Sequence, residues 1–262
     1  AADARFSREG YNLVVNAYGG SDDRVSLTNY FYSDNYRRFH FQFGDQTLGM
    51  ADIAKQAFEF SGTDNRDYLY GWVTNDTIHG GDGDDGIYGY AGDDTLHGDA
   101  GNDRLTGDEG NDHLNGGTGD DTLKGGSGDD ILEGSEGNDS LYGNEGKDTL
   151  NGGSGDDYLE GGDFGSDTYV FQAGHGKDTV AEKAYEDKDA DTLRFKGAKA
   201  QDARFSREGD NLVVNAYGNN DQVTLRRYFY SDNYNRYDFH FDDATFKAAE
   251  LRGKDLPTEG LK

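Results

Sequence analysis

The 262-residue chain contains no cysteine and only one proline, one methionine and one tryptophan. Without cysteine, neither a disulfide framework nor a thiolate metal site can hold the fold together. No apolar run approaches the roughly 20 residues that a membrane-spanning helix needs, and no signal peptide is recognisable. Because the chain begins AADARF, without Met, we expect it to be a segment of something longer.

Basic residues are also scarce: 25 Lys and Arg stand against 52 Asp and Glu, for a net charge of -27. This balance argues against nucleic acid as a partner, because phosphate binding needs a basic surface. Cations are the natural partners instead. Hydrophobic residues make up only 33%, which is typical of disorder, but 18 Tyr and 15 Phe indicate that part of the chain packs.

Glycine, by contrast, is abundant and follows a strict period of nine. Glycine, aspartate and an aliphatic residue recur at the first, sixth and eighth positions of eleven units that run from Gly62 to Glu160. A second glycine fills the fourth position from Gly83 to Gly155, so nine consecutive units fit the pattern G-x-x-G-x-D-x-L-x. A period of nine predicts a short turn and a short strand that stack as a solenoid.

We expect six residues of each unit to form the turn, and the apolar residue to lie in a three-residue strand with alternate faces in and out. Two units then complete one coil, and the aliphatic residues of two sheets meet in a thin core. One Leu per nine residues buries too little apolar surface to offset the entropy of ordering the unit. The array should therefore be unfolded without a ligand.

A divalent cation would reverse this balance. Stacking brings each sixth-position Asp near the Asp eighteen residues on, while glycine lets backbone carbonyls point inward. Carboxylate and carbonyl oxygens in a flexible shell of six or more ligands favour calcium over zinc and copper. Magnesium is the rival, but it prefers to keep its waters.

The stretch GGTGDDTLKGGSGDDILEG, residues 116–134, resembles the G-G-x-G-x-D-x-U-x pattern of the RTX, or haemolysin-type, calcium-binding repeats. The resemblance covers roughly residues 62–170. It implies a parallel β-roll in which each calcium ion lies between turns i and i+2. The ion is then held by the sixth-position Asp of both turns and by carbonyls of the first four positions.

On this resemblance the metal-binding residues are the sixth-position aspartates and the first- and fourth-position glycines. The aspartates are Asp76, Asp85, Asp94, Asp103, Asp112, Asp121, Asp130, Asp139, Asp148, Asp157 and Asp167. The glycines are Gly80, Gly83, Gly89, Gly92, Gly98, Gly101, Gly107, Gly110, Gly116, Gly119, Gly125, Gly128, Gly134, Gly137, Gly143, Gly146, Gly152 and Gly155. The turn pairs from Gly80/Gly98 to Gly134/Gly152 give seven consensus sites, so we expect about seven calcium ions or more.

The two ends of the array depart from the pattern. Asn65 and Thr74 replace the fourth-position glycine in the first two units, which puts their sites in doubt. One extra residue near Phe164 interrupts the last unit, and Gly165 and Asp167 restore the pattern.

A longer repeat flanks the array. ARFSREGYNLVVNAYG at 4–19 returns as ARFSREGDNLVVNAYG at 203–218, and YFYSDNY at 30–36 returns at 228–234. Both copies predict a small aromatic-rich β module with a strand, a turn, a strand and an alternating run, and the period-two aromatics of YFYSDNY suit a sheet core. They resemble the haemolysin-type calcium-binding-related domain, with GHGKDTV at 174–180 and DTLRF at 191–195 as its connector.

We therefore expect an all-β chain in three parts. Residues 1–58 would cap a preceding block and end in a short linking helix, MADIAKQAF at 50–58. Residues 59–172 would form the calcium-binding β-roll, and residues 173–262 the connector and a C-terminal β cap.

Two other features carry weaker signals. The aromatic cluster YLYGWV, residues 68–73, is expected to cover the open N-terminal end of the roll, with a sugar-stacking platform as the alternative. The six histidines show no paired spacing and are expected at surface or turn positions rather than as ligands; they are His40, His79, His97, His113, His175 and His240. No nucleophile elbow, Walker loop or dinucleotide fingerprint is present, so no enzyme activity is expected.

The resemblance implies a calcium-binding module of a large secreted bacterial protein, a toxin or adhesin, that folds outside the cell after type I secretion. Its partners would be calcium ions, neighbouring blocks of the parent protein and a host cell surface or glycan. Two alternatives stay open: an accessory module of a secreted protease, lipase or polysaccharide epimerase, and a calcium-dependent glycan-binding module.

Overall fold

In the computed structural model, the described residues contain 25 β-strands. The structure describes the strands within residues 5–48 and then residues 59–163, 165–181, 190–218, 220–230, 236–247 and 250. The expected linking helix at 50–58 lies outside these residues. Within the part of the chain that the structure describes, no helix is long and apolar enough to cross a membrane.

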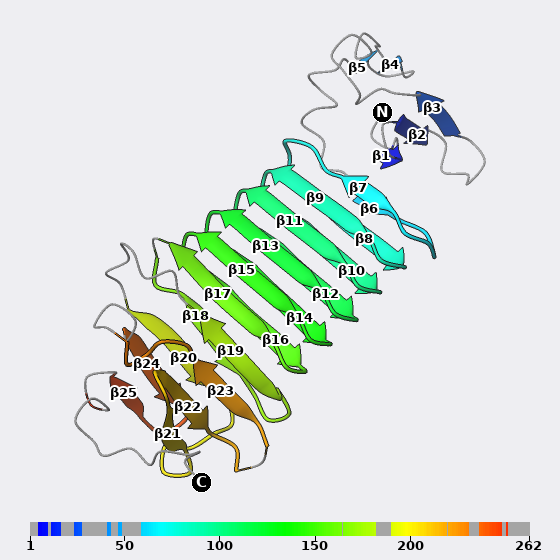
Figure 1. The fold of residues 1–262 in the computed structure, drawn as a ribbon. Coiled ribbons are helices and arrows are strands. Elements are labelled where there is room, and N and C mark those ends of the chain that lie inside the picture. Colours follow the sequence, from blue (N-terminus) through cyan, green and yellow to red (C-terminus); the bar gives the residue numbers. More distant parts are fainter. Residues whose placement is uncertain are drawn as a thin grey trace.

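The nonapeptide units form a parallel β-solenoid, which confirms the predicted β-roll (Figure 1). Alternate units contribute strands to two sheets. The first sheet contains β6 (Glu59–Ser61), β8 (Thr77–Asp82), β10 (Thr95–Ala100), β12 (His113–Thr118), β14 (Ile131–Glu136) and β16 (Thr149–Ser154). The second contains β7 (Tyr68–Tyr70), β9 (Gly86–Ala91), β11 (Arg104–Glu109), β13 (Thr122–Ser127), β15 (Ser140–Glu145) and β17 (Tyr158–Asp163).

Each strand pairs with the strand eighteen residues later, so equal positions of the repeat lie side by side. Leu96 is opposite Leu114 in the first sheet, and Leu105 is opposite Leu123 in the second. The eighth-position side chains of both sheets form one buried core. They are fully buried from the second unit onward, at Ile78, Ile87, Leu96, Leu105, Leu114, Leu123, Leu132, Leu141, Leu150 and Leu159.

The complete roll strands are six residues long, so the prediction of three-residue strands was wrong. Parallel pairing resumes beyond the first-position glycine: Gly126 is opposite Asn144, and Ser127 is opposite Glu145. The strands therefore continue through the third position of the next unit. Only the fourth to sixth positions remain as the turn, where Gly128 adopts a left-handed φ of 130°.

Beyond the roll, both sheets continue without interruption into the C-terminal region. The first sheet adds β18 (Thr168–Phe171), β20 (Asp191–Phe195), β24 (Tyr237–Phe241) and β25 (Thr245–Lys247). The second adds β19 (Lys177–Ala181), β23 (Gln222–Leu225), β22 (Asn211–Asn215) and β21 (Arg204–Glu208). The expected connector thus supplies two strands, β19 and β20, of the same solenoid.

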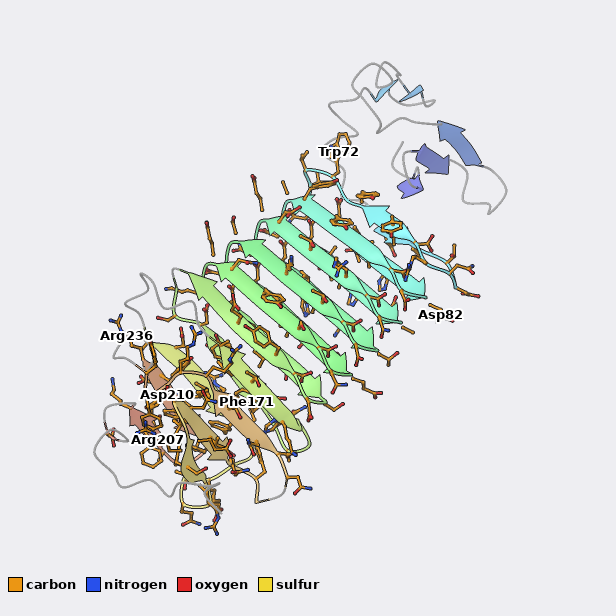
Figure 2. The ribbon with its side chains drawn as sticks, viewed as in Figure 1. Trp72, Asp82, Phe171, Arg207, Asp210 and Arg236 are labelled. Atoms are coloured by element: carbon orange, nitrogen blue, oxygen red, sulfur yellow. The ribbon has the colours of Figure 1, made fainter. Side chains whose placement is uncertain are left out.

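Aromatic rings join the aliphatic side chains in this part of the core. Phe195 stacks on Phe171 with ring centroids 5.4 Å apart, and on Phe241 at 5.0 Å. Tyr228 stacks on Tyr237 at 6.2 Å. Figure 2 places Phe171 at this end of the molecule and Trp72 at the opposite end of the roll.

The duplicated module has the same strand pattern in both copies. In the first copy, β1 (Arg5–Glu9), β2 (Asn12–Asn16) and β3 (Arg24–Leu27) form an antiparallel sheet, and β4 (Phe41–Gln42) pairs with β5 (Thr47–Leu48). Strands β21, β22 and β23 repeat the antiparallel arrangement, and β23 also pairs in parallel with β19.

The expected alternating strand in YFYSDNY does not form over residues 228–230. These residues lie in a turn, where Tyr228 is fully buried but Tyr230 is 67% exposed. Residues 231–235 are outside the described part. The alternating run that the sequence predicts at the end of the second module is YDFHF at 237–241, and it does form a strand, with Tyr237, Phe239 and Phe241 buried.

Candidate metal sites in the turns

The sixth-position aspartates form a hydrogen-bonded ladder through the turns. The backbone N–H of each aspartate donates to Oδ1 of the aspartate in the second turn along. This bond measures 2.7 Å between Asp94 and Asp112 and 2.8 Å between Asp121 and Asp139. The same bond joins every such pair from Asp67 to Asp167, so the predicted eighteen-residue neighbours do meet.

The second carboxylate oxygen is different, because in nine consecutive aspartates it is buried and has no hydrogen-bond partner in the protein. These oxygens are Oδ2 of Asp85, Asp94, Asp103, Asp112, Asp121, Asp130, Asp139, Asp148 and Asp157. The residues themselves are at most 3% exposed. A buried carboxylate oxygen without a partner is costly unless a cation compensates it.

The first-position glycines leave open the space into which these oxygens point. A Cβ atom on Gly80 would lie 2.6 Å from Oδ2 of Asp85 and 2.5 Å from the carbonyl oxygen of Gly98. No side chain fits there, so only glycine lets this carboxylate oxygen and this carbonyl oxygen approach each other. A carboxylate and a backbone carbonyl are ligand types that calcium prefers.

Side chains alone do not complete such a site. Among the described residues, no three His, Asp or Glu side chains converge as a metal-binding group. An ion in the turns would take a large part of its shell from backbone carbonyls, which are ligands that calcium accepts.

Burial dominates the electrostatics of the aspartate ladder. It raises the pKa of Asp103 to about 6, of Asp94 to about 7 and of Asp130 to about 8, and neighbouring carboxylates add to the increase. The hydrogen bond that each carboxylate accepts from a backbone N–H lowers its pKa, but the effect of burial is larger. A divalent cation would favour the charged form again.

The fourth-position glycines allow neighbouring turns to approach closely. Gly119 has a left-handed φ of 120°, and a Cβ atom there would clash with the carbonyl oxygen of Gly101. The extra residue before Gly165 is accommodated without loss of this contact, because Gly165 meets the carbonyl of Gly146 in the same way. Asp148 then donates its N–H to Oδ1 of Asp167 at 2.8 Å.

The two atypical units at the N-terminal end already contain protein donors for their carboxylates. Oδ2 of Asp67 accepts hydrogen bonds from the backbone N–H and the hydroxyl of Thr63, at 2.6 and 2.8 Å. Oδ2 of Asp76 accepts one from the N–H of Trp72 at 2.6 Å. These are the units whose sites the sequence puts in doubt.

At the other end the ladder extends past the residues that sequence reasoning identified. Asp157 donates its N–H to Oδ1 of Asp178 at 3.1 Å, and Asp167 donates to Oδ1 of Asp191 at 2.9 Å. Both new members keep one signal of the repeat, since an aliphatic residue follows two positions later, at Val180 and Leu193. Irregular spacings of 21 and 24 residues conceal that signal.

The described histidines lie in two environments. His79 stacks on His97 with centroids 4.5 Å apart, and His113 Nε2 is 3.4 Å from a carboxylate oxygen of Glu133; these three side chains are partly exposed. His175 differs, because its ring is buried and its Nδ1 lies 2.7 Å from Oδ2 of Asp178. His175 thus lies in a turn, as expected, but its side chain is buried rather than at the surface.

Comparisons with known proteins find relatives of the repeat region. The family model of the RTX calcium-binding nonapeptide repeat matches residues 60–178 in seven overlapping segments. A 71-residue stretch is 46% identical to iron-regulated protein FrpA of Neisseria meningitidis serogroup C, covering 27% of this chain and only 6% of that relative. The crystal structure of the extracellular lipase LipA from Serratia marcescens aligns with a TM-score of 0.32 and 21% identity, over 65% of this chain and 38% of the lipase. The β-roll of residues 60–178 therefore belongs to the family of RTX calcium-binding nonapeptide repeats.

Proposed function

We propose that this chain is a calcium-dependent folding module of a large secreted bacterial protein, and that calcium bound in the turns supplies the stability that the thin core of the roll does not provide. The observation that carries the proposal is the row of nine buried carboxylate oxygens without protein partners. Calcium that binds only the folded roll stabilises it by mass action at every site.

The same row suggests how many ions are bound. Nine aspartates at nine-residue intervals, from Asp85 to Asp157, form seven pairs that are eighteen residues apart. These pairs coincide with the seven consensus turn pairs of the sequence. The carboxylates of each pair and the carbonyls of the first four turn positions would hold one ion.

Secretion and the parent protein are further parts of the proposal. RTX repeats are typical of secreted proteins, and a module that is unfolded at low calcium suits passage through a type I channel. The duplicated flanking modules favour a multi-block toxin or adhesin, with residues 1–58 and 173–262 as caps around the roll of residues 59–172. An enzyme could carry the same module as an accessory part.

A calcium titration tests the proposal. In EDTA at pH 8 we expect the full chain to lose most of its β-sheet circular dichroism, and added calcium to restore it cooperatively while magnesium does not. Native mass spectrometry should count about seven ions. A roll that stays ordered in EDTA at this pH would contradict the proposal.

A single substitution that removes one negative charge tests the ligand assignment. Asp121→Asn removes one buried carboxylate that faces two turn pairs, so the calcium midpoint should rise about tenfold or more. The matched control is Glu136→Gln, which removes the same charge from an exposed side chain. Equal midpoints for the two variants would contradict the assignment.

One groove favours glycan binding as a second function. It has a volume of about 310 Å³ and is lined by Tyr68, Tyr88, Asn102, Arg104 and Asp120 among others. The Tyr68 ring lies against the backbone of Gly86, where a Cβ atom would be 2.9 Å from the ring. Aromatic faces can stack on sugar rings, while amide, guanidinium and carboxylate groups bind hydroxyls.

Several carboxylates line this groove, so a neutral glycan fits it better than an anionic one. On a glycan array with calcium, Tyr68→Ala should abolish binding of neutral glycans. Tyr142→Ala, on the same sheet but outside the groove, should not. Absence of neutral glycans among the hits would exclude this second function.

A further inference from the structure

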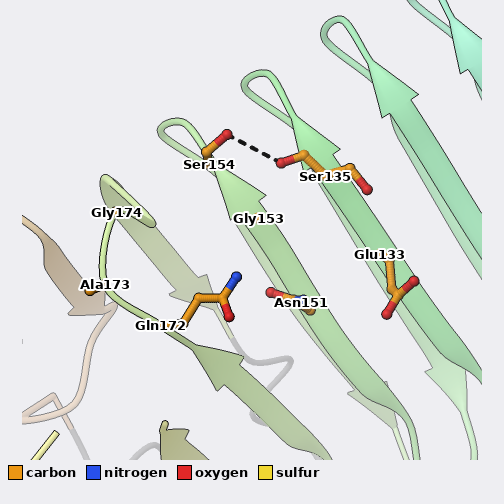
Figure 3. Close-up of a pocket in the computed structure, with 8 residues that line it drawn as sticks. All are labelled: Glu133, Ser135, Asn151, Gly153, Ser154, Gln172, Ala173 and Gly174. Carbon is orange, nitrogen blue, oxygen red and sulfur yellow. Dashed lines mark hydrogen bonds between the residues drawn. The ribbon is translucent and has the colours of Figure 1, made fainter. Parts of the chain in front are cut away.

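The turn between β18 and β19, residues 173–178, repeats the backbone contacts of the calcium-type turns. A Cβ atom on Gly176 would clash with the carbonyl oxygen of Gly155, just as one on Gly155 would clash with that of Gly137. Gly174 and Gly176 have left-handed φ angles of 92° and 88°, the conformation found at the second and fourth positions of the turn before. Figure 3 shows Gly174 beside Gly153 and Ser154 of that turn, where they line a common groove.

The difference lies in the hydrogen-bond partner of the second carboxylate oxygen. From Asp85 to Asp157, Oδ2 has no partner in the protein. In this turn, Nδ1 of His175 is 2.7 Å from Oδ2 of Asp178, and both side chains are buried. An ionised carboxylate can only accept, so the imidazole N–H donates this bond.

His175 corresponds to the third position of the repeat unit. The side chain at this position is exposed in Ser127, Glu136 and Ser154. Its ring turns inward instead, where it packs 5.2 Å from the Phe171 ring and edge-on to Tyr217 at 5.7 Å. These contacts come from β18 and from the C-terminal cap. They hold the imidazole beside Oδ2, the carboxylate oxygen that has no protein partner in the turns from Asp85 to Asp157.

We propose that His175 takes the place of a cation in this turn, so that the row of calcium sites ends at Asp157 and the turn of residues 173–178 closes without an ion. The inference rests on the proposed calcium binding of the roll. It assigns to His175 the role of a residue that excludes calcium. The boundary between the calcium-dependent roll and the calcium-independent cap then lies at this turn.

Replacing this side chain tests the inference directly. Because a first-position Cβ atom would crowd the carboxylate, the test is made in an Ala173→Gly background, where His175→Ser gives the turn GGSGKD, which is close to the GGSGDD of residues 152–157. We expect native mass spectrometry of the full chain to count one more calcium ion than in Ala173→Gly alone. The control His97→Ser removes a partly exposed histidine from the outer sheet face and should leave the count unchanged.

A second pair of variants decides the matter if His175→Ser does not fold. Asp178→Asn should keep the wild-type ion count, because Asp178 holds no calcium, whereas Asp157→Asn should lose one ion. Loss of an ion in Asp178→Asn, or equal counts in folded Ala173→Gly with and without His175→Ser, would overturn the inference alone. A wild type without bound calcium would overturn the proposed function as well.

Discussion

Two regions of this molecule share the same two sheets but differ in what stabilises them. Between residues 80 and 157, each nine-residue unit buries one aliphatic side chain and one aspartate, whose second oxygen has no protein partner. From Phe171 to Phe241, stacked aromatic rings pack together with buried aliphatic side chains in the interior, and the buried carboxylate of Asp178 is paired with His175.

The comparison separates backbone geometry from the source of stability. Parallel pairing continues from β16 through β18 and β20 to β24, and left-handed glycines occur in both regions, so these two features cannot explain why one region would need calcium. The difference lies in apolar area and in the partners of buried charge, which together decide whether a solenoid turn is stable by itself.

Hydrogen exchange in EDTA should show the largest effect. We expect amides of β10–β16 to exchange as in an unfolded chain, while those of β22 and β24 keep measurable protection. At a calcium concentration 100 times Kd, each site contributes about 2.7 kcal/mol, so removal of several sites exceeds the stability of the roll. Equal protection of both regions in EDTA would remove the distinction between them.

Two glycine substitutions should differ strongly in cost. Gly125 has no left-handed φ, but a Cβ atom there would overlap the carboxylate of Asp130, so Gly125→Ala should raise the calcium midpoint about tenfold or more. Gly174 has a φ of 92° and no atom within 4 Å of the added carbon, so Gly174→Ala should cost only about 1–2 kcal/mol of backbone strain. Thermal melts in calcium would measure both, and a larger loss in Gly174→Ala would contradict the steric argument.

The pH dependence without calcium should be the reverse of that of most proteins. Burial raises the folded-state pKa of Asp94 to about 7 and of Asp130 to about 8, well above that of an unfolded Asp. The folded state therefore binds more protons between pH 4 and 8, and this contribution to stability is lost as the pH rises through that range.

Circular dichroism in EDTA at pH 8 and pH 5 checks this prediction. The sample at pH 5 should contain more β-structure, and the difference between EDTA and calcium should be smaller there. A calcium-containing sample at each pH serves as the control. More β-structure in EDTA at pH 8 than at pH 5 would show that the aspartates are not buried in the calcium-free state.

The smallest expected effect on stability concerns the second position of the repeat unit. Ser135 has a left-handed φ of 85°, where several other units have glycine, so Ser135→Gly should stabilise the roll by about 0.5–1 kcal/mol. Ser127→Gly, at an exposed third position without a left-handed φ, should lower stability by a similar amount. Calcium-saturated melts of both variants would show shifts of opposite sign.

The sequence by itself determined the repeating part of the molecule. The nine-residue period specifies which residues become neighbours at a separation of eighteen, and it therefore predicted the parallel roll, the Leu core and the meeting of Asp121 with Asp139. Such information is local and repeated, so one unit defines all the others.

Only the tertiary structure decided where the pattern begins and ends. Strands of six residues arise because neighbouring coils align, and Asp178 and Asp191 join the ladder across irregular spacings that no period reveals. The burial of His175 depends on Phe171, Tyr217 and Asp178, which come from separate strands and turns. Contacts of this kind are fixed by packing between distant segments, and a repeat pattern contains no record of them.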